Sequence, residues 1–565
     1  MSMLGAELVI DCLKNEGGEV VFGYPGSAVL TLYDVLYKTG FPHVLTGHEQ
    51  GAVHAAEGYA RATGKVGVCF ATSGPGATNL ITGIANAYMD SIPLVAITGQ
   101  VGVALIGKDS FQEADICGIT TPITKHNYLV KNVQELPSVL KEAFYIARTG
   151  RPGPVVVDIA KDVFNASLEN CEYPKFVQLK GYTPRFDGDA RAVELSVQAL
   201  KQAKRPVIFV GGGVNLSGTA GILQTLVQML GMPVVSSLMG LGCIPCNMPQ
   251  YLGMVGMHGG YAANMAICEC DLLLAMGVRF NDRVTGVVKD FASKAKIIQF
   301  DIDPAEVNKN VRTDLSVLGD LRWSLPLLVN KLGCYESSKW QQGISDWNDE
   351  VKRWKRERPL GYSPTGDRIR PQAVIGKVNE LAPEDSIIVT DVGQHQMWTA
   401  QYYQFCNQRT FITSGGLGTM GFGLPAAIGA QLGLPAKKVI LFTGDGSIMM
   451  NCQEIATLAE LGLPIKIIVI NNKALGLVSQ WQRMFYGQRY SHSSTKRCVD
   501  LVKVAEGMGI TGLRITTYED LTSGIKQALE IDGPVLVGVL VSERENVLPM
   551  VPPGGRLDQM ILSNG

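Results

Sequence analysis

The segments Val439-Ile-Leu-Phe-Thr-Gly-Asp445-Gly-Ser447 and Pro464-Ile-Lys-Ile-Ile-Val-Ile-Asn471-Asn472 decide the fold of this chain. Each is an apolar run rich in β-branched residues that stops at a small polar residue, as buried strands do. The segment from Met449 to Leu461 between them has the pattern of one helix. A strand, a helix and a strand in this order predict parallel strands joined by a right-handed crossover. Asp445 and Asn472 then lie at the carboxyl ends of neighbouring strands, where open α/β sheets bind ligands.

The polar residues at these two strand ends suit a metal-held diphosphate. Mg²⁺ prefers oxygen ligands and keeps several positions for water and phosphate, so one carboxylate and one amide oxygen are an appropriate protein contribution. The glycines on either side of Asp445 let a diphosphate approach the backbone. A lone Gly-Asp-Gly is also a common turn signal. The sequence therefore predicts a phosphorylated cofactor bound through a metal, with a plain turn as the alternative.

Length and composition limit the class of protein. The chain has 565 residues, and about 150 residues per domain predicts three or four domains. Hydrophobic residues make up 46% and charged residues 18%, which favours large buried cores over disorder. The net charge is −1 without a basic block, so we expect no nucleic-acid partner. No apolar run reaches the roughly 18 residues of a membrane span, so we expect no membrane partner.

The twelve cysteines are scattered along the chain. Cys243 and Cys246 form a C-x-x-C, which could be redox-active or half of a zinc site. A second ligand pair is missing, which favours ordinary reduced thiols. Together with an N-terminus that enters a helix at Ala6–Asn15 without a signal or transit pattern, this predicts a cytoplasmic protein.

Strands alternating with helices divide the chain into three α/β blocks, residues 1–180, 189–340 and 370–550, followed by a tail at 551–565. This alternation predicts three doubly wound parallel-sheet domains, of which the first and third could share a fold. Lys180–Gly188 is interpreted as one linker, and Ser337–Pro371 as a second, partly helical linker. The clearest predicted strands are Val66–Ala71, Leu94–Thr98, Pro154–Asp158, Pro206–Val210, Asp271–Ala275, Ile297–Asp301 and Ser386–Thr390.

Four further features have ordinary structural interpretations on local grounds. Glu49 precedes a helix, where a carboxylate complements the helix dipole without any other role. The glycine-dense segment Ser414–Gly423 is a flexible loop or a place where backbone approaches a ligand. Gly211–Gly213 follows a strand but lacks the full G-x-G-x-x-G, which favours a turn. Trp481 on local grounds is a core residue.

Across all three blocks these motifs resemble the catalytic subunit of acetolactate synthase, also called acetohydroxyacid synthase, in its FAD-containing biosynthetic branch. The G-D-G-S and N-N pair resembles the motif of thiamin diphosphate (ThDP) enzymes. The resemblance implies the ThDP-binding fold and the cofactors ThDP, Mg²⁺ and FAD. It also implies that pyruvate is decarboxylated via hydroxyethyl-ThDP and condensed with pyruvate or 2-ketobutyrate. The products are then 2-acetolactate or 2-aceto-2-hydroxybutyrate, for valine, leucine and isoleucine biosynthesis.

The resemblance assigns roles at the ThDP site. Glu49 matches the glutamate that hydrogen-bonds the aminopyrimidine and promotes its imino tautomer. The Gly418 carbonyl and Met420 match the pyrimidine contacts. The protein ligands of Mg²⁺ are expected to be Asp445, Asn472 and the carbonyl of Ala474. The other expected ThDP contacts are Gly26, Gln394, His395, Gly446 and Ser447.

The resemblance also assigns an FAD site, in which the flavin does no net redox work. Its expected contacts come from the middle block, apart from one arginine of the first block. They are Arg151, Gly211, Gly212, Gly213, Leu238, Met239, Met257, His258, Gly277, Arg279, Asp301, Ile302 and Asp320.

The substrate channel is expected at three places. Gln100 and the loop Ser110–Glu113, with Gln112, resemble its lining, and Lys125 and Lys161 are expected near it. Trp481 is expected to narrow the acceptor pocket and favour 2-ketobutyrate. The segment 549–555 resembles a lid.

Glu49 lies far in sequence from the metal motif, and in the family the two halves of the site come from different subunits. We therefore expect a homodimer or homotetramer with active sites at the interface, and leave open a small regulatory subunit. The alternatives are another FAD-bearing ThDP enzyme, similar to glyoxylate carboligase or pyruvate oxidase, and a non-catalytic flavin-binding protein. Glyoxylate carboligase lacks the glutamate that Glu49 matches. An intact Glu49, Asp445 and Asn472 argue against a non-catalytic protein.

Overall fold

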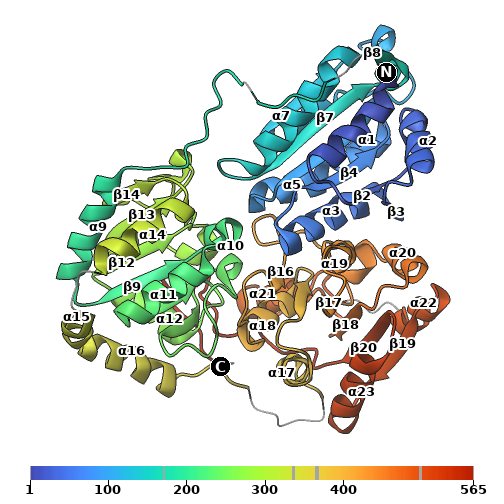
Figure 1. Ribbon diagram of the computed structural model, residues 1–565. Coiled ribbons are helices and arrows are strands. Elements are labelled where there is room, and N and C mark those ends of the chain that lie inside the picture. Colours follow the sequence, from blue (N-terminus) through green and yellow to red (C-terminus); the bar gives the residue numbers. More distant parts are fainter. Residues whose placement is uncertain are drawn as a thin grey trace.

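Three six-stranded parallel sheets, each flanked by helices, build the protein (Figure 1) and confirm the predicted α/β class. The structure is a computed structural model that describes residues 2–169, 172–177, 179–333, 337–362, 368–494 and 499–563. A small antiparallel pair, β1 (Ser2–Leu4) and β8 (Ser167–Glu169), closes the first domain. Among the described residues, no helix is both long and apolar enough to cross a membrane.

The first domain has the strand order β3-β2-β4-β5-β7-β6. Its strands are buried and β-branched at the centre, as parallel sheets covered on both faces require. The strands are β2 (Val21–Gly23), β3 (His43–Leu45), β4 (Gly67–Ala71), β5 (Leu94–Gln100), β6 (His126–Val130) and β7 (Pro154–Ala160). The helices are α1 (Gly5–Asn15), α2 (Leu30–Thr39), α3 (Glu49–Thr63), α4 (Pro75–Asn79), α5 (Ile81–Asp90), α6 (Ile116–Thr120), α7 (Leu136–Arg148) and α8 (Lys161–Asn165).

The third domain repeats that order as β16-β15-β17-β18-β20-β19. Numbered along each domain, both sheets are 2-1-3-4-6-5, so the first and third domains share a topology. The strands are β15 (Ile387–Thr390), β16 (Phe411–Ile412), β17 (Val439–Gly444), β18 (Lys466–Asn471), β19 (Thr511–Ile515) and β20 (Val535–Leu540). The helices are α17 (Pro371–Leu381), α18 (Gln394–Tyr402), α19 (Gly423–Gly433), α20 (Glu454–Leu461), α21 (Gly476–Phe485), α22 (Leu501–Gly507) and α23 (Tyr518–Glu530).

The middle domain has the order β11-β10-β9-β12-β13-β14, which is 3-2-1-4-5-6 along the domain. This is the order of doubly wound dinucleotide-binding sheets. The strands are β9 (Pro206–Val210), β10 (Val234–Ser236), β11 (Tyr251–Met254), β12 (Leu272–Met276), β13 (Lys296–Asp301) and β14 (Leu315–Leu318). The helices are α9 (Ala190–Gln202), α10 (Gly212–Ser217), α11 (Ala220–Leu230), α12 (Tyr261–Glu269), α13 (Asp282–Thr285), α14 (Leu321–Leu332), α15 (Ser337–Gly343) and α16 (Ser345–Glu357).

Two local expectations differ from the structure. The helix expected from Met449 begins only at Glu454, because a 3₁₀ turn (Ile448–Met450) precedes it and the Asn451 amide donates to the carbonyl of Gly421 over 2.8 Å. The expected linker after residue 337 contains α15 and α16. Trp347 and Trp354 of α16 are buried in the apolar core of the middle domain, so this stretch packs as part of that domain.

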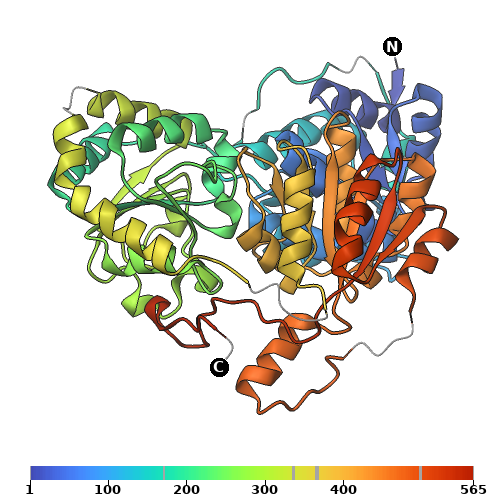
Figure 2. The ribbon, with the colours of Figure 1, turned by 90° about the horizontal axis from the view of Figure 1, so that it is seen from below.

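The first and third domains pack against each other, and the middle domain lies to one side of them (Figure 2). The first and third domains contact each other through α3 and α19, the helices that follow the second strand of the first and third sheets, respectively. Glycines let the two backbones touch: a Cβ on Gly58 would lie 2.0 Å from the oxygen of Ala426, and one on Gly429 would lie 1.8 Å from that of Ala55. This contact holds the first and third sheets together as one unit of the chain.

Candidate active site

The two strand ends of the metal motif lie side by side. β17 and β18 pair in parallel register, with Gly444 opposite Ile470, so Asp445 and Asn472 emerge at the same sheet edge. The Asn472 amide donates from Nδ2 to Gln394 Oε1 over 3.0 Å, which directs its oxygen the other way. That Oδ1 accepts from the amide of Ala474 at 3.2 Å. The predicted juxtaposition is therefore present in the fold.

The donors at this edge fit a hard divalent cation. Within the described ranges, no group of three or more His, Cys, Asp or Glu side chains could hold a metal. A metal here would rely on the Asp445 carboxylate, the Asn472 amide oxygen and the Ala474 carbonyl. An all-oxygen set with one carboxylate suits Mg²⁺ that also takes phosphate oxygens.

The N-terminus of α18 supplies the next two expected contacts, Gln394 and His395. Burial lowers the pKa of His395 to about 3, so the imidazole is neutral. Its Nε2 is buried and has no hydrogen-bond partner among the residues that the structure describes. A buried polar atom of this kind calls for a ligand, and a diphosphate beside Asp445 would provide one. Ser447 donates to the Val392 carbonyl over 2.7 Å.

The glycine-dense segment reaches the metal motif from the other side. Gly418 has a φ of 71°, a left-handed conformation that favours glycine. A Cβ on Gly446 would lie 3.8 Å from Cε of Met420, so the methionine lies beside the motif. Met420 and Gly446 therefore lie side by side, with Gly418 two residues before Met420.

Glu49 is the first residue of α3, at the carboxyl edge of the first sheet. Its carboxylate is 9% exposed and accepts from the Asn79 amide at 3.0 Å. Gly26 begins the turn after β2, and the neighbouring Ser27 donates to Gln112 Oε1 over 3.4 Å. The structure therefore brings Gly26, Glu49 and Gln112 to one edge, while the metal motif lies on the third domain.

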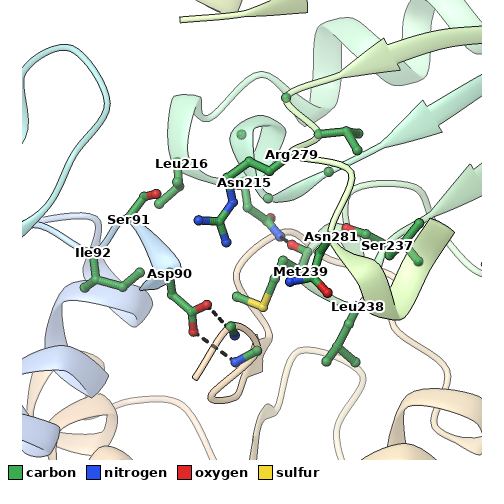
Figure 3. Close-up of a pocket in the computed structure, with 18 of the residues that line it drawn as sticks. Asp90, Ser91, Ile92, Asn215, Leu216, Ser237, Leu238, Met239, Arg279 and Asn281 are labelled. Atoms are coloured by element: carbon green, nitrogen blue, oxygen red, sulfur yellow. Dashed lines mark hydrogen bonds between the residues drawn. The ribbon is translucent and has the colours of Figure 1, made fainter. Parts of the chain in front are cut away.

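A cavity of about 960 Å³ lies where the three domains meet (Figure 3). Every residue expected to contact FAD lines it, from Arg151 of the first domain to Asp320 of the middle domain. The cavity opens between the ends of β9 and β12, the switch point of the middle sheet, where such folds bind dinucleotides. There the amide of Gly211 donates to the Met276 carbonyl over 2.9 Å, and a Cβ on Gly211 would lie 2.1 Å from the oxygen of Gly277.

The two arginines of the cavity differ in whether they form ion pairs. Arg151 pairs with Glu306 at 2.7 Å and donates to Ser91 at 2.8 Å. The Arg279 side chain extends into the cavity (Figure 3) and makes no hydrogen bond or ion pair within the described part of the chain. Burial raises the pKa of Asp301 to about 6. An unpaired guanidinium in a cavity is suited to an anionic ligand.

The channel residues divide into two groups. Gln100 ends β5 opposite Ala160 of β7, and Lys161 directly follows β7. Trp481 on α21 lines the cavity and an adjoining hollow. Lys125, in contrast, precedes β6 at the amino edge of the sheet. Its Nζ donates to the Thr149 carbonyl at 2.7 Å and Tyr182 at 3.0 Å. Its expected place near the channel is therefore wrong, because it caps the end of α7.

The C-terminal segment packs on the middle domain beside the cavity. The Val551 amide donates to the Met257 carbonyl over 2.8 Å, and Pro549 O lies 3.4 Å from His258 Nδ1. Val551 and Leu557 are buried in the core of that domain. Its predicted role as a lid stays a prediction.

The C-x-x-C does not act as a unit. Cys243 is buried, whereas the sulfur of Cys246 lies 2.9 Å from that of Cys406 in the third domain. Among the cavity residues that sequence reasoning missed are Asp90, Ser91, Asn215 and Leu216 (Figure 3). They belong to no motif, and only the fold brings them together.

The sequence matches three models of thiamine pyrophosphate enzymes. The N-terminal TPP binding domain matches residues 3–119, the central domain residues 193–328 and the C-terminal TPP binding domain residues 391–539. The chain is 46% identical to the acetolactate synthase large subunit of Haemophilus influenzae over 99% of this chain and 98% of that protein. It is also 46% identical to the isozyme 3 large subunit of Escherichia coli, over 100% of this chain and 99% of that protein. The chain belongs to the acetolactate synthase large subunits.

This membership confirms the resemblance seen in the sequence motifs. The large subunit of Lactococcus lactis is also 46% identical, over 99% of this chain and 96% of its own length. Glu49 lies in the matched N-terminal TPP binding domain, and Asp445 and Asn472 lie in the matched C-terminal one. Both domains are therefore thiamin diphosphate-binding domains, and thiamin diphosphate is the cofactor of the protein.

Proposed function

We propose that this chain is the catalytic subunit of an acetolactate synthase that uses ThDP, Mg²⁺ and FAD. It decarboxylates pyruvate and joins the remaining two-carbon unit to pyruvate or 2-ketobutyrate, giving 2-acetolactate or 2-aceto-2-hydroxybutyrate. The observation that carries this proposal is the near-complete coverage of acetolactate synthase large subunits at 46% identity. The positions of Glu49 at the start of α3 and of Asp445 and Asn472 at strand ends support it.

The residues of this chain have separate roles around the cofactor. Bound ThDP supplies the carbanion stabilisation that breaking and making the carbon–carbon bonds requires. Glu49 holds a proton at the aminopyrimidine. Asp445, Asn472 and the Ala474 carbonyl hold Mg²⁺, and Met420 supports the cofactor's posture. Lys161 and Gln112 lie at the substrate side, and Trp481 limits the acceptor.

FAD is proposed for the 960 Å³ cavity. The middle domain has the strand order of dinucleotide-binding sheets, and the cavity lies at its switch point. The unpaired Arg279 is suited to a diphosphate. The visible spectrum of the purified protein tests this assignment, because bound flavin absorbs where the polypeptide does not. A colourless protein that takes up no added FAD would contradict it.

An oligomer is proposed as the active form. Glu49 is held by Asn79 of its own domain and Asn472 by Gln394 of its own, so each half of the site is built separately. We propose that the halves meet across a homodimer or homotetramer interface. The relatives' designation as large subunits supports a small regulatory partner. The thiols of Cys243, Cys246 and Cys406 form no disulfide, which suits a cytoplasmic location.

The test is to incubate the protein with pyruvate, ThDP, Mg²⁺ and FAD and to measure acetolactate. Acetolactate that increases with time is the expected result. Its absence, with and without a regulatory subunit, would overturn the proposal. In a parallel assay in aerated phosphate buffer, acetyl phosphate with hydrogen peroxide would indicate an oxidase instead.

A further inference from the structure

Asp90, the last residue of α5, binds two consecutive backbone amides of the glycine-dense segment. Its Oδ2 accepts from the amide of Gly415 at 2.9 Å, and its Oδ1 accepts from that of Gly416 at 2.7 Å. Figure 3 shows the carboxylate pointing from the first domain at these two amides. A Cβ on Gly416 would lie 2.9 Å from Oδ1, so the close approach depends on glycine. A carboxylate that takes two amides makes strong, charge-assisted bonds.

A buried network holds the Asp90 carboxylate in place. Arg61 of α3 donates to Asp90 at 2.9 Å and to Glu57 at 3.1 Å, and its side chain is only 5% exposed. Asn86 donates to Glu57 at 2.7 Å, and its oxygen accepts from Ser414 at 2.5 Å. A buried pair of this kind is costly to break from one side, because the remaining charge stays buried. The first domain thus fixes the segment at Ser414, Gly415 and Gly416.

The far end of the same segment is held by its own domain. The Gly421 amide donates to Asp391 at 2.8 Å, and the Gly421 carbonyl accepts from Asn451 at 2.8 Å. Gly418 and Met420 lie between the two anchored ends. On one side, Gly415 to Gly418 line the 960 Å³ cavity, and on the other side Met420 lies beside Gly446.

We propose that Asp90, supported by Arg61, is a positioning residue for ThDP. By fixing two amides in the first half of the segment, it sets where the Gly418 carbonyl and Met420 stand. This inference rests on the proposed ThDP site, but it does not depend on which 2-ketoacid reacts. It gives the first domain a role in shaping the part of the ThDP site that lies on the third domain.

The test is Asp90→Asn, which keeps the size but turns one acceptor into a donor that faces an amide N–H. ThDP affinity is measured by intrinsic fluorescence at saturating Mg²⁺, without substrate, so the result does not require acetolactate synthesis. We expect the dissociation constant to rise at least about tenfold, which corresponds to about 1.4 kcal/mol. The KM for pyruvate at saturating ThDP is expected to change less than twofold. The matched control is Asp11→Asn on the exposed face of α1, with unchanged ThDP affinity.

A purely structural role would give a different result. Asp90→Asn would then lower the melting temperature of the cofactor-free protein while the ThDP dissociation constant stayed within twofold, and this outcome overturns the proposal. If Asp90→Asn does not fold, Ser414→Ala asks the same question, because it removes the bond to Asn86 and the acceptor for the Thr419 amide at 2.9 Å. A rise of about threefold or more supports the proposal, and unchanged affinity overturns it. Loss of acetolactate synthesis in the wild-type protein would refute the proposed function alone.

Discussion

The first and third domains have the same strand order but different chemistry at the carboxyl ends of equivalent strands. After the third strand, the first domain has Thr72 and the third domain has Asp445. After the second strand, the first domain enters α3 at Glu49 through a short turn, whereas the third domain passes through the longer glycine-dense segment that begins at Ser414 before α19. In the proposed site, one sheet edge offers a proton-holding carboxylate, and the other offers the ligands of a metal and a glycine-rich backbone segment. The same scaffold supports both because loops, not strands, determine the site.

The largest expected effect comes from removing the proton-holding group of the first domain. Glu49→Gln keeps the shape and a partner for Asn79 but cannot exchange a proton. Acetolactate formation should fall about 10³-fold, within the range of general acid–base catalysis, while ThDP affinity changes less than threefold. Activity assays and fluorescence titration measure the two quantities. Glu135→Gln, on an exposed turn of the same domain, is the control, and unchanged turnover in Glu49→Gln would refute its role.

The next effect tests the difference between Thr72 and Asp445 directly. Asp445→Asn removes the charged ligand, so the Mg²⁺ concentration for half-maximal ThDP binding should rise about 10²-fold. Thr72→Val changes the equivalent position of the first domain and should leave that concentration unchanged. Titration of Mg²⁺ at fixed ThDP measures both. Equal responses of the two variants would mean that the edges are not specialised.

A third test concerns the helix start after the first strand, where only the third domain has a buried histidine. Because burial lowers the His395 pKa to about 3 from 6.5, the unfolded chain binds more protons at mildly acidic pH. Its contribution to stability is complete above pH 6.5 and is lost as the pH falls towards 3. Between pH 7.5 and 5.5 the wild type should lose about 1.4 kcal/mol more than His395→Asn. Thermal unfolding of the cofactor-free proteins at both pH values checks this, and parallel losses would contradict it.

The strands were predictable because their signal is local. Pro206–Val210 was predicted with its observed bounds, and the other strands that were predicted lie within about two residues of theirs, since each is a β-branched run between polar turns. The helix start at Glu454 was missed because a side-chain bond from Asn451 to Gly421 ends the preceding turn. Asp90 was missed because its partners lie 325 and 326 positions away. Lys125 was misplaced because a lone lysine carries no information about sheet edges.

The smallest expected effect is at the segment after the fourth strand, where the two domains differ in form. The first domain has the loop with Gln112, and the third domain has α21 with Trp481, which borders the cavity and the adjoining hollow. Trp481→Leu enlarges the pocket but removes no charge or hydrogen bond that chemistry needs. The preference for 2-ketobutyrate over pyruvate should fall by roughly fivefold, because a pocket wall discriminates one methylene by about 1 kcal/mol. Competition between the two acceptors measures the product ratio at unchanged pyruvate consumption. An unaltered ratio would place the acceptor against the loop of the first domain instead.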